Sequence, residues 1–369
     1  MKLADLACGA GEWLRGAGPM HDVVISSRVR LARNLAGVPF LAQCSPEQQH
    51  EIEQRLRREI LAAGIAREVL YVDIAGACEL DRQLLVERHL ISRQHATASH
   101  PRGVAISSDE TCAIMVNEED HLRMQVLRSG LDLADAVAEI MRVDDMLEAR
   151  LDYAFHGKYG YLTACPTNVG TGLRVSVMLH LPALKLTGEI EKAFRAAHDM
   201  RLAIRGLFGE GTEASGDFFQ VSNQTTLGKT EEQIVHEFLT EMVPQFVQYE
   251  RRAREALIKR RGIAVDDKTK RSLALLRTAR LINTDETMYL LSLVRLGINI
   301  GRLEEVDLKT INELFLLTQP AHLQKMLNKQ LEPDDRSRHD HQGQQRPEHS
   351  GKGLAHGVGS SGLVSDERG

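Results

Sequence analysis

Export signals, disulfide patterns and long apolar runs are all missing from this sequence of 369 residues. Its cysteines are odd in number and far apart, and no two of them form a C-x-x-C pair; they are Cys8, Cys44, Cys78, Cys112 and Cys165. This spacing argues against both a disulfide framework and a zinc site. A reducing cytoplasm fits the cysteine usage best.

No window approaches the ~20 apolar residues that a membrane-spanning helix needs. The N-terminal stretch MKLADLACGAGEW also lacks a basic region followed by an apolar run, so we expect neither export nor a membrane anchor. A formal charge of -5 and a pI near 6.3 give no overall attraction to nucleic acid or to an anionic membrane. The remaining composition, 43% hydrophobic and 26% charged, is that of a folded protein long enough for two domains.

Capping and alternation patterns predict a mixture of helices and antiparallel strands. Ser45, Pro46 and Gln48 form the start of a helix over 45–63, and Gly64 is its stop. The segments GVAIS, TCAIMVN and DHLRMQVL read as three strands that follow one another closely, which implies an antiparallel sheet.

The middle of the chain continues this mixed order of elements. We expect a helix over 131–151, an alternating strand over 173–181, a helix near 188–204, a strand over 218–223, and a helix from Thr230 to Lys259 with a kink at Pro244. The strand over 173–181 has leucine and valine on one face and Arg174, Ser176, Met178 and His180 on the other. The pattern indicates an α+β fold, because helices and strands do not alternate regularly.

Changes in composition divide the chain into four parts. We expect an N-terminal segment over 1–22, a mixed α+β domain over 23–258 and an all-helical domain over 259–330, where Thr284 and Gly297 flank one predicted helix. Residues 331–369 contain no Ile, Phe, Tyr, Trp or Met, so we expect a disordered tail there.

Five arginines lie beside predicted strand ends or glycine-rich turns: Arg28, Arg30, Arg123, Arg174 and Arg205. Guanidinium groups match phosphate oxygens in geometry and charge, so this set indicates a pocket for a polyphosphate such as a nucleotide. Each segment alone also fits a simpler reading, such as a basic edge strand or a solvated charge cluster.

Two segments add carboxylates to these arginines. If NEEDHLR continues a strand, Glu119, His121 and Arg123 project from one face and share one pocket. The loop RGLFGEGTEASGD has four glycines and three acidic residues, which is typical either of a lid that closes over substrate or of a plain surface loop.

The strings SSRVRLARN, NEEDHLR, CPTNVGTGLR and RGLFGEGTE, in this order and spacing, resemble the phosphagen kinases, the family of creatine and arginine kinases. Only 25 residues precede SSR here, whereas the metabolic enzymes carry a helical domain of about a hundred residues at that place. The strings VERHLIS, MLHLPAL, QVSNQTTLGK and RLGINIG are similar to the bacterial protein-arginine kinases of this family, over roughly residues 10–332. The resemblance implies an antiparallel sheet flanked by helices, akin to the catalytic domain of glutamine synthetase, followed by a helical dimerisation domain.

The resemblance also implies the reaction and the residues that perform it. The γ-phosphoryl group of ATP, with Mg²⁺, would pass to arginine side chains of proteins. Glu119 would be the catalytic carboxylate, with Glu210 reaching in from the loop. The implied ATP-binding residues are Ser26, Ser27, Arg28, Val29, Arg30, His89, Arg123, Arg174, Val175, Ser176, Val177, Met178, Arg205, Gly206, Leu207, Phe208 and Gly209.

Cys165, beside the site, would contact the substrate guanidinium and make the enzyme sensitive to oxidation; an inert buried thiol is the alternative. We expect no metal ligand from protein side chains. The alanine and an aspartate of the RDxxRA phosphoarginine motif are missing at Arg336–His341, which argues against phosphoarginine feedback.

The partners that the resemblance implies are proteins with exposed arginines, an activator of the McsA type, a heat-shock repressor, a Clp ATPase and a second copy of the chain, in the bacterial stress response. Two alternatives stay open at this point. The chain could phosphorylate a free guanidino compound, or it could act as a regulatory adaptor without turnover.

Overall fold

The computed structural model describes residues 3–97, 99–207 and 215–328. The tail expected over 331–369, the motif comparison at Arg336–His341 and the loop residues Phe208, Gly209 and Glu210 lie outside these residues. Every helix among the described residues is too short or too polar to cross a membrane.

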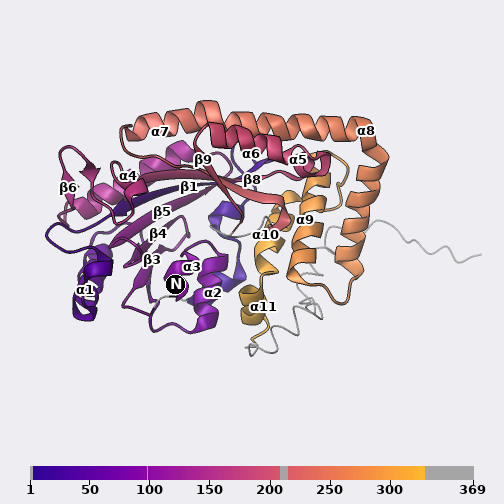
Figure 1. Ribbon diagram of the computed structural model, residues 1–369. Helices are drawn as coiled ribbons and strands as arrows, with labels where there is room; N and C mark the ends of the chain where they lie inside the picture. Colours follow the sequence, from indigo (N-terminus) through magenta and orange to yellow (C-terminus); the bar gives the residue numbers. More distant parts are fainter. Residues whose placement is uncertain (1–2, 98, 208–214, 329–369) are drawn as a thin grey trace, which may run out of the picture.

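One antiparallel sheet of eight strands organises the molecule (Figure 1). The strand order is β2-β3-β4-β5-β1-β8-β10-β9, and a separate small hairpin pairs β6 with β7. The strands are β1 Val24–Arg33, β2 Val69–Asp73, β3 Gly103–Ser107, β4 Cys112–Val116, β5 Leu122–Ser129, β6 Phe155–His156, β7 Gly160–Tyr161, β8 Leu173–His180, β9 Leu202–Arg205 and β10 Phe218–Asn223.

Helices cover both faces of this sheet and form the end of the described chain. They are α1 Pro46–Ala62, α2 Glu79–Glu87, α3 Arg93–Thr97, α4 Leu133–Glu148, α5 Pro182–Thr187, α6 Ile190–Asp199, α7 Glu231–Glu237, α8 Val243–Thr278, α9 Thr284–Asn299, α10 Leu308–Leu317 and α11 Pro320–Met326. Short 3-10 turns lie at Leu3–Cys8, Glu12–Leu14, Leu41–Gln43, Pro166–Asn168 and Ser215–Asp217. The α+β prediction is confirmed.

The apolar face of the sheet builds the main core. α4 packs on β1 and β5, while α1 packs on β3 and β4. The alternation expected for 173–181 is confirmed, because Leu173, Val175 and Val177 are buried in this core and Arg174 lies on the other face. The three-strand prediction is also confirmed as β3, β4 and β5.

The predicted start and stop of α1 are confirmed in detail. The Ser45 hydroxyl accepts a hydrogen bond from the Gln48 backbone N–H, and the Gln48 side chain accepts one from the Ser45 N–H. Gly64 follows with a φ of 68°, in the left-handed region that glycine tolerates best.

The helix expected near 188–204 is shorter than predicted. α6 ends at Asp199, and Leu202–Arg205 instead form the edge strand β9, which pairs with β10 through Gln220↔Arg205 and its neighbours. Pairing with an existing strand outweighs the local helical preference of this segment. The correction matters because it places Arg205 on the sheet.

The helix expected over 230–259 is interrupted and much longer. α7 ends at Glu237, a π-helical turn follows over Phe238–Met242, and α8 then begins at Val243. Pro244 is the second residue of α8, which directly follows this π-helical turn, and the turn accommodates the N–H that proline lacks. The non-helical backbone inside α8 is at Arg261, where α8 turns to run down beside α9 in Figure 1.

The predicted boundaries of α9 are wrong by a few residues. Asn283, and not Thr284, caps the helix, since its side chain accepts a hydrogen bond from the Glu286 N–H. Gly297 does not stop the helix, which continues to Asn299. A Cβ at Gly297 would lie 2.8 Å from Leu303 Cδ1, so glycine is needed there for close packing.

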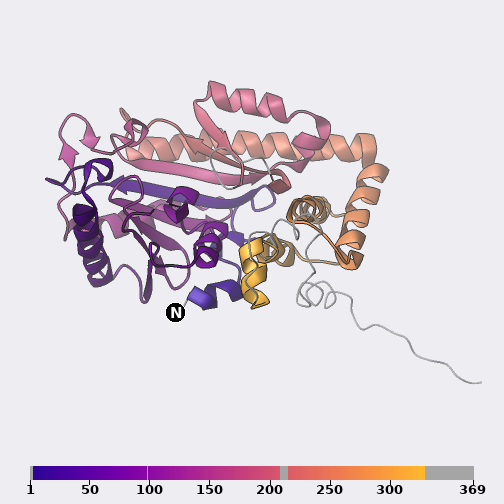
Figure 2. The ribbon, with the colours of Figure 1, turned by 60° about the horizontal axis from the view of Figure 1, so that its bottom comes forward.

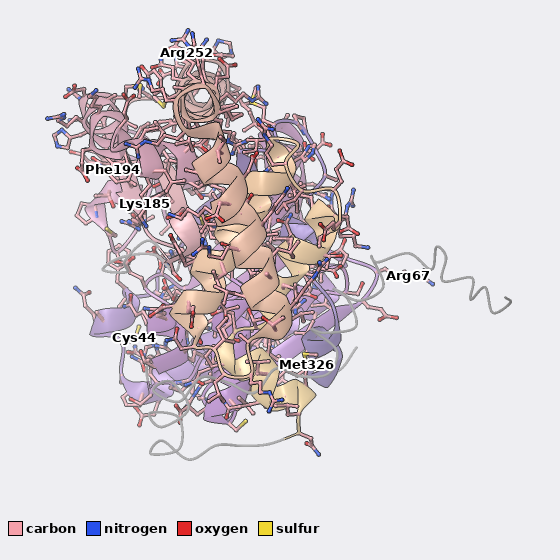
Figure 3. All side chains as sticks on the ribbon, turned by 90° about the vertical axis from the view of Figure 1, so that its right-hand side faces the viewer. Cys44, Arg67, Lys185, Phe194, Arg252 and Met326 are labelled. Atoms are coloured by element: carbon pink, nitrogen blue, oxygen red, sulfur yellow. The ribbon has the colours of Figure 1, made fainter. Side chains whose placement is uncertain are left out.

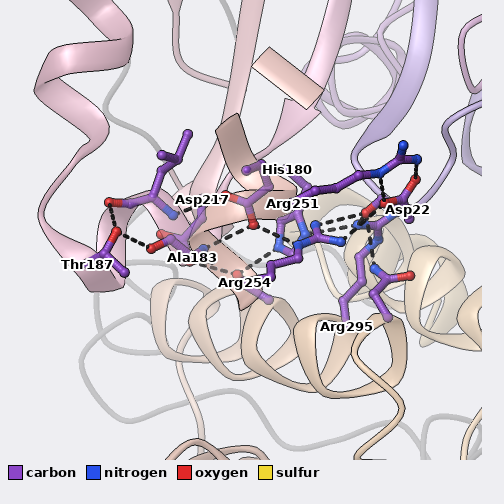
Figure 4. A network of polar contacts seen from close by, with 12 residues as sticks. Asp22, His180, Ala183, Thr187, Asp217, Arg251, Arg254 and Arg295 are labelled. Atoms are coloured by element: carbon purple, nitrogen blue, oxygen red, sulfur yellow. Dashed lines mark hydrogen bonds and ion pairs between the residues drawn. The ribbon is translucent and has the colours of Figure 1, made fainter. Parts of the chain in front are cut away.

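The helical C-terminal part is joined to the sheet by buried polar contacts (Figure 4). Asp217 accepts a hydrogen bond from Ser292 of α9 at 2.7 Å, and Arg295 donates to the carbonyl of Asp22 and to the His180 ring. At the other end, α11 packs against α2 and the first 3-10 turn, as Figure 2 shows from below. Figure 3 follows this part from Arg252 on α8 down to Met326 on α11.

Candidate active site

The central strands carry the five arginines to one face of the sheet. Arg30 of β1 lies directly across from Arg174 of β8, and Arg28 lies across from Ser176. β5 brings Arg123 opposite Ala32, and β9 brings Arg205 opposite Gln220 of β10. Arginines up to 177 residues apart in sequence therefore converge because the strands pair in this register.

These arginines line one cleft of about 850 Å³, a size that suits a nucleotide. We call this set the arginine cluster. The side chains that share the cleft with it include His89, Ser92, Gln94, Glu118, Glu119, Asp120, Cys165, Gln220 and Thr225.

The arginine cluster is electrostatically unfavourable without an anion. Burial, together with the charges of Arg123, Arg174 and Arg205, lowers the pKa of Arg28 to about 9. The pKa of Arg30 falls well below its ordinary value, first through burial and then through repulsion from Arg123. Buried like charges of this kind are stabilised by a polyanion, so the residues present fit the phosphates of a nucleotide.

Three consecutive acidic residues form the turn between β4 and β5. Glu118 is buried and its carboxylate accepts hydrogen bonds from Arg123 and Ser92, both at 2.6 Å. Burial alone would raise the pKa of Glu118, but the charge of Arg123 and these hydrogen bonds hold it at about 2. Glu119 is half-buried and lines the cleft.

The shared face expected for Glu119, His121 and Arg123 is wrong. β5 begins only at Leu122, and the turn before it rotates His121 away from the cleft. The His121 ring is buried, accepts a hydrogen bond from the Leu35 N–H and contacts the carbonyl of Pro39. Its role is to fix the loop after β1.

Asp120 also lines the cleft, but its hydrogen bonds are made within the protein. Its Oδ1 accepts hydrogen bonds from the Asn34 side chain at 2.6 Å and from the Ala164 N–H at 2.7 Å. Asp120 therefore ties the carboxylate turn to the segment that carries Cys165.

His89 lines the cleft, and Trp13 packs against it beside a small adjoining cavity. His89 follows α2 with a φ of 59°, and its ring meets Trp13 edge-on at 4.7 Å. Burial lowers the pKa of His89 to about 3, with a further contribution from Arg28. The neutral ring and the indole adjoin a small cavity that Ser26, Ser176 and Met178 also line.

The remaining expected ATP-binding residues fall into two groups. The first group does not reach the cleft. Its three valines, Val29, Val175 and Val177, are in the core, and the Ser27 hydroxyl donates to the carbonyl of Gly130. Gly206 is buried directly after β9, and Leu207 lines the cleft. Strand alternation predicts the first group, since these residues alternate with Arg28, Arg174 and Ser176.

Cys165 lines the cleft beside the glycine turn, with its Sγ 3.0 Å from Thr167 Oγ1. It is partly exposed, so the alternative of an inert buried thiol does not apply. Among the described residues no group of three His, Cys, Asp or Glu side chains could hold a metal ion.

Several lining residues gave no sign in the sequence. Trp13 lies in the stretch that was predicted only as an N-terminal segment. Ser92 directly precedes α3 and Gln94 lies within it, in sequence of ordinary composition. Gln220 and Thr225 face the cleft from β10 and the loop after it. Alternation along FFQVSN could have found Gln220, because it stands between buried apolar residues.

Comparison with known proteins agrees with this geometry. The family described as "ATP:guanido phosphotransferase, C-terminal catalytic domain" matches residues 51–253. The chain therefore belongs to the ATP:guanido phosphotransferases. The family described as "Protein-arginine kinase McsB C-terminal domain" matches residues 262–341, so within that class the chain belongs to the protein-arginine kinases.

Curated relatives match along nearly their whole length. The chain is 44% identical to the protein-arginine kinase of Halothermothrix orenii over 91% of this chain and 96% of the relative. It is 47% identical to that of Symbiobacterium thermophilum over 88% of this chain and 92% of the relative. It is 43% identical to that of Bacillus subtilis over 88% of this chain and 89% of the relative.

Solved structures give the same class of fold. A duplicated taurocyamine kinase from Schistosoma mansoni is similar with a TM-score of 0.58 and 27% identity; the match covers 68% of this chain and 35% of that one. A lombricine kinase is similar with a TM-score of 0.53 and 25% identity; the match covers 67% of this chain and 70% of that one. The predicted phosphagen-kinase fold is thereby confirmed.

Proposed function

We propose that this enzyme transfers the γ-phosphoryl group of ATP to the guanidinium group of arginine side chains in proteins. The observation that carries the proposal is the convergence of the arginine cluster and Glu119 on one cleft. Family membership supports the same reaction, because the matching relatives are named protein-arginine kinases.

The arginine cluster would bind the ATP phosphates and neutralise charge on the transferring group. His89 would lie near the nucleoside, because it lines the same cleft as Arg28. Ser26, Ser176 and Met178 line an adjoining cavity of about 10 Å³, which is too small for the nucleoside itself, so they would support that part of the cleft. Mg²⁺ bound together with ATP would supply further positive charge at the phosphates. The described protein side chains offer no ligand cluster of their own for it.

Glu119 would act on the acceptor. A guanidinium nitrogen is no nucleophile while it keeps its proton, because the pKa of arginine exceeds 12. As the nitrogen attacks phosphorus, its proton would pass to Glu119, the bond from the γ-phosphorus to the bridging oxygen would break, and ADP would leave. Cys165 would contact the guanidinium from the other side, and Glu210 would orient it.

The broader biological setting belongs to the same proposal. We infer a catalytic domain over 23–258 and a helical domain over 259–330, supported by the bend of α8 at Arg261. The helical domain would form a dimer and bind an McsA-type activator, a heat-shock repressor and a Clp ATPase during stress. The described cysteines are free thiols, which supports a cytoplasmic location.

The test is phosphorylation of casein by the purified chain with Mg-ATP, with products mapped by mass spectrometry at neutral pH, which spares the P–N bond. The wild type should produce phosphoarginine. Glu119→Gln should lower kcat by about 10²–10⁴-fold, because it removes the proton acceptor. Glu51→Gln, an exposed carboxylate on α1, is the matched control and should leave kcat unchanged.

Two results would contradict the proposal. Phosphate on free arginine or creatine, with none on casein, would indicate a metabolic guanidino kinase. Full activity of Glu119→Gln would remove the carboxylate from the mechanism.

A further inference from the structure

The β6–β7 hairpin presents aromatic side chains to solvent. All five residues from Phe155 to Tyr159 are exposed, and the Phe155 and Tyr159 side chains retain 61% and 45% of their accessible surface. The His156 ring stacks on Tyr159 with a centroid distance of 4.9 Å. Apolar surface gathered in this way on a short projection is characteristic of an interaction site.

The base of this hairpin is held firmly. The Arg33 guanidinium lies 3.5 Å from the centre of the Tyr161 ring and donates to Asp144 at 2.6 Å. Tyr161 and Gly170 exchange backbone hydrogen bonds, and the Leu162 N–H donates to the carbonyl of Ala154. The exposed rings therefore stand on a preformed support, which reduces the entropy lost when a partner binds.

The hairpin leads directly into the part of the cleft that Glu119 and Cys165 line. After Tyr161 the chain passes through Ala164, whose N–H donates to Asp120 beside Glu119, and reaches Cys165 in the wall of the cleft. Three residues lie between Tyr161 and Cys165, so their Cα atoms are at most about 14 Å apart. An extended peptide of four or five residues covers that distance.

A second contact outside the cleft would help an acceptor that can reach it. Glu118 inside the cleft is already paired with Arg123, so it is not free to bind an entering guanidinium. A free guanidino compound has only the cleft to bind, whereas an arginine within a protein also brings the residues on either side of it. Apolar contact outside the cleft would add attraction that only the protein acceptor can use.

We propose that the Phe155–Tyr159 tip binds the peptide segment next to the target arginine of a protein substrate, which would favour protein arginine over free arginine. The inference rests on the proposed function, since it names how the same site selects its acceptor. The occupant is an extended, apolar stretch of an unfolded or loosely folded protein, because exposed rings on a hairpin offer flat apolar surface and no deep pocket.

The test compares two acceptors, reduced carboxymethylated casein and N-acetylarginine methylamide, with wild type and the double variant Phe155→Ser/Tyr159→Ser. The KM for casein should rise by roughly tenfold or more, because two aromatic contacts are lost. The kcat with casein, the KM for ATP and the rate with the small acceptor should stay unchanged. Leu61→Ser/Tyr249→Ser, on α1 and α8, removes similar exposed apolar surface elsewhere and should alter none of these values.

Other outcomes would overturn the proposal in separate ways. An unchanged KM for casein refutes peptide docking at the tip, and a lower sedimentation mass with that unchanged KM assigns the tip to contact between copies of the chain. An equal loss of activity with casein and with the small acceptor shows that the hairpin shapes the cleft and does not select proteins. A wild type that phosphorylates neither acceptor refutes the proposed function and this inference together. If the wild type is active, the double variant tests this inference alone.

Discussion

Glu118 makes three polar contacts that hold the edge of the arginine cluster. Its carboxylate accepts hydrogen bonds from the Ser92 hydroxyl, the Arg123 guanidinium and the Glu119 N–H. The last contact fixes the backbone at Glu119 itself. Glu118 is thus a positioning residue for two groups that would act on the substrates.

These contacts predict an acid-sensitive contribution to stability. The folded pKa of Glu118, about 2, lies below its ordinary value of 4.5, so its stabilising effect is complete above pH 4.5 and disappears as the pH falls toward 2. The effect is on the order of 3 kcal/mol. Glu118→Gln should therefore flatten the fall in melting temperature across this pH range.

Thermal melts of Glu118→Gln, wild type and Glu51→Gln, at half-unit steps of pH, would measure the effect. Glu51→Gln should follow the wild type, because Glu51 is exposed on α1. Parallel curves for Glu118→Gln and wild type would show that Glu118 has an ordinary pKa in the folded protein.

Single residues of the site were predictable to very different degrees. The arginine cluster could be found because its members stand beside glycines, strand ends and carboxylates in the sequence. Glu118 could not be separated from Glu119, because adjacent carboxylates differ only once the turn before β5 is known. Trp13 was missed since a lone tryptophan before β1 carries no periodic pattern that would link it to His89.

At the scale of elements, the turn before β8 depends on Gly172. Its φ is 67°, and a Cβ there would lie 2.7 Å from both the carbonyl oxygen of Ala32 and Arg33 Nη1. The Gly172 carbonyl accepts a hydrogen bond from the Ala32 N–H. β1 and β8 can approach at this point only because position 172 has no side chain.

We predict that Gly172→Ala lowers the free energy of unfolding by about 3 kcal/mol, through left-handed strain and a clash with backbone. Gly37→Ala is the matched control, because Gly37 has a φ of 71° and nothing within 4 Å of its Cβ position. It should cost only about 1 kcal/mol. Urea unfolding of both variants measures the difference, and equal losses would show that the clash at 172 is relieved.

Elements with local signals were predicted well, and those that depend on partners were not. α1 carries its own capping box, and β8 its own alternation, so both follow from the sequence. β9 was read as helix, because Leu202–Arg205 become a strand only by pairing with β10. The length of α8 was missed since helical sequence on both sides of Arg261 gives no sign of where one helix bends.

At the scale of the whole molecule, the helical part shares a core with the sheet. Phe315 of α10 packs edge-on against Phe218 of β10, with ring centres 4.6 Å apart. Trp13 and Leu127 lie in the same apolar cluster. The sequence indicated a separate helical unit. It could not show that the N-terminal segment packs between that unit and the sheet, because such contacts leave no local pattern.

This shared core predicts that the helical part and the sheet unfold together. Trp13 is the sole tryptophan, so its fluorescence reports the junction, whereas circular dichroism at 222 nm reports the helices. The two signals should give the same urea midpoint in the wild type. Phe315→Ala should lower both midpoints equally, with a loss of about 3–5 kcal/mol from the cavity it leaves.

Ile263→Ala, at an exposed position after the bend of α8, is the control and should leave both midpoints in place. If Phe315→Ala lowered the fluorescence midpoint and left the helical signal unchanged, the junction would open on its own. Cooperative loss of both signals would instead mean that any partner bound to the helical part also stabilises the junction around Trp13. Binding there would then raise the urea midpoint of both signals together, because both regions share one folding equilibrium.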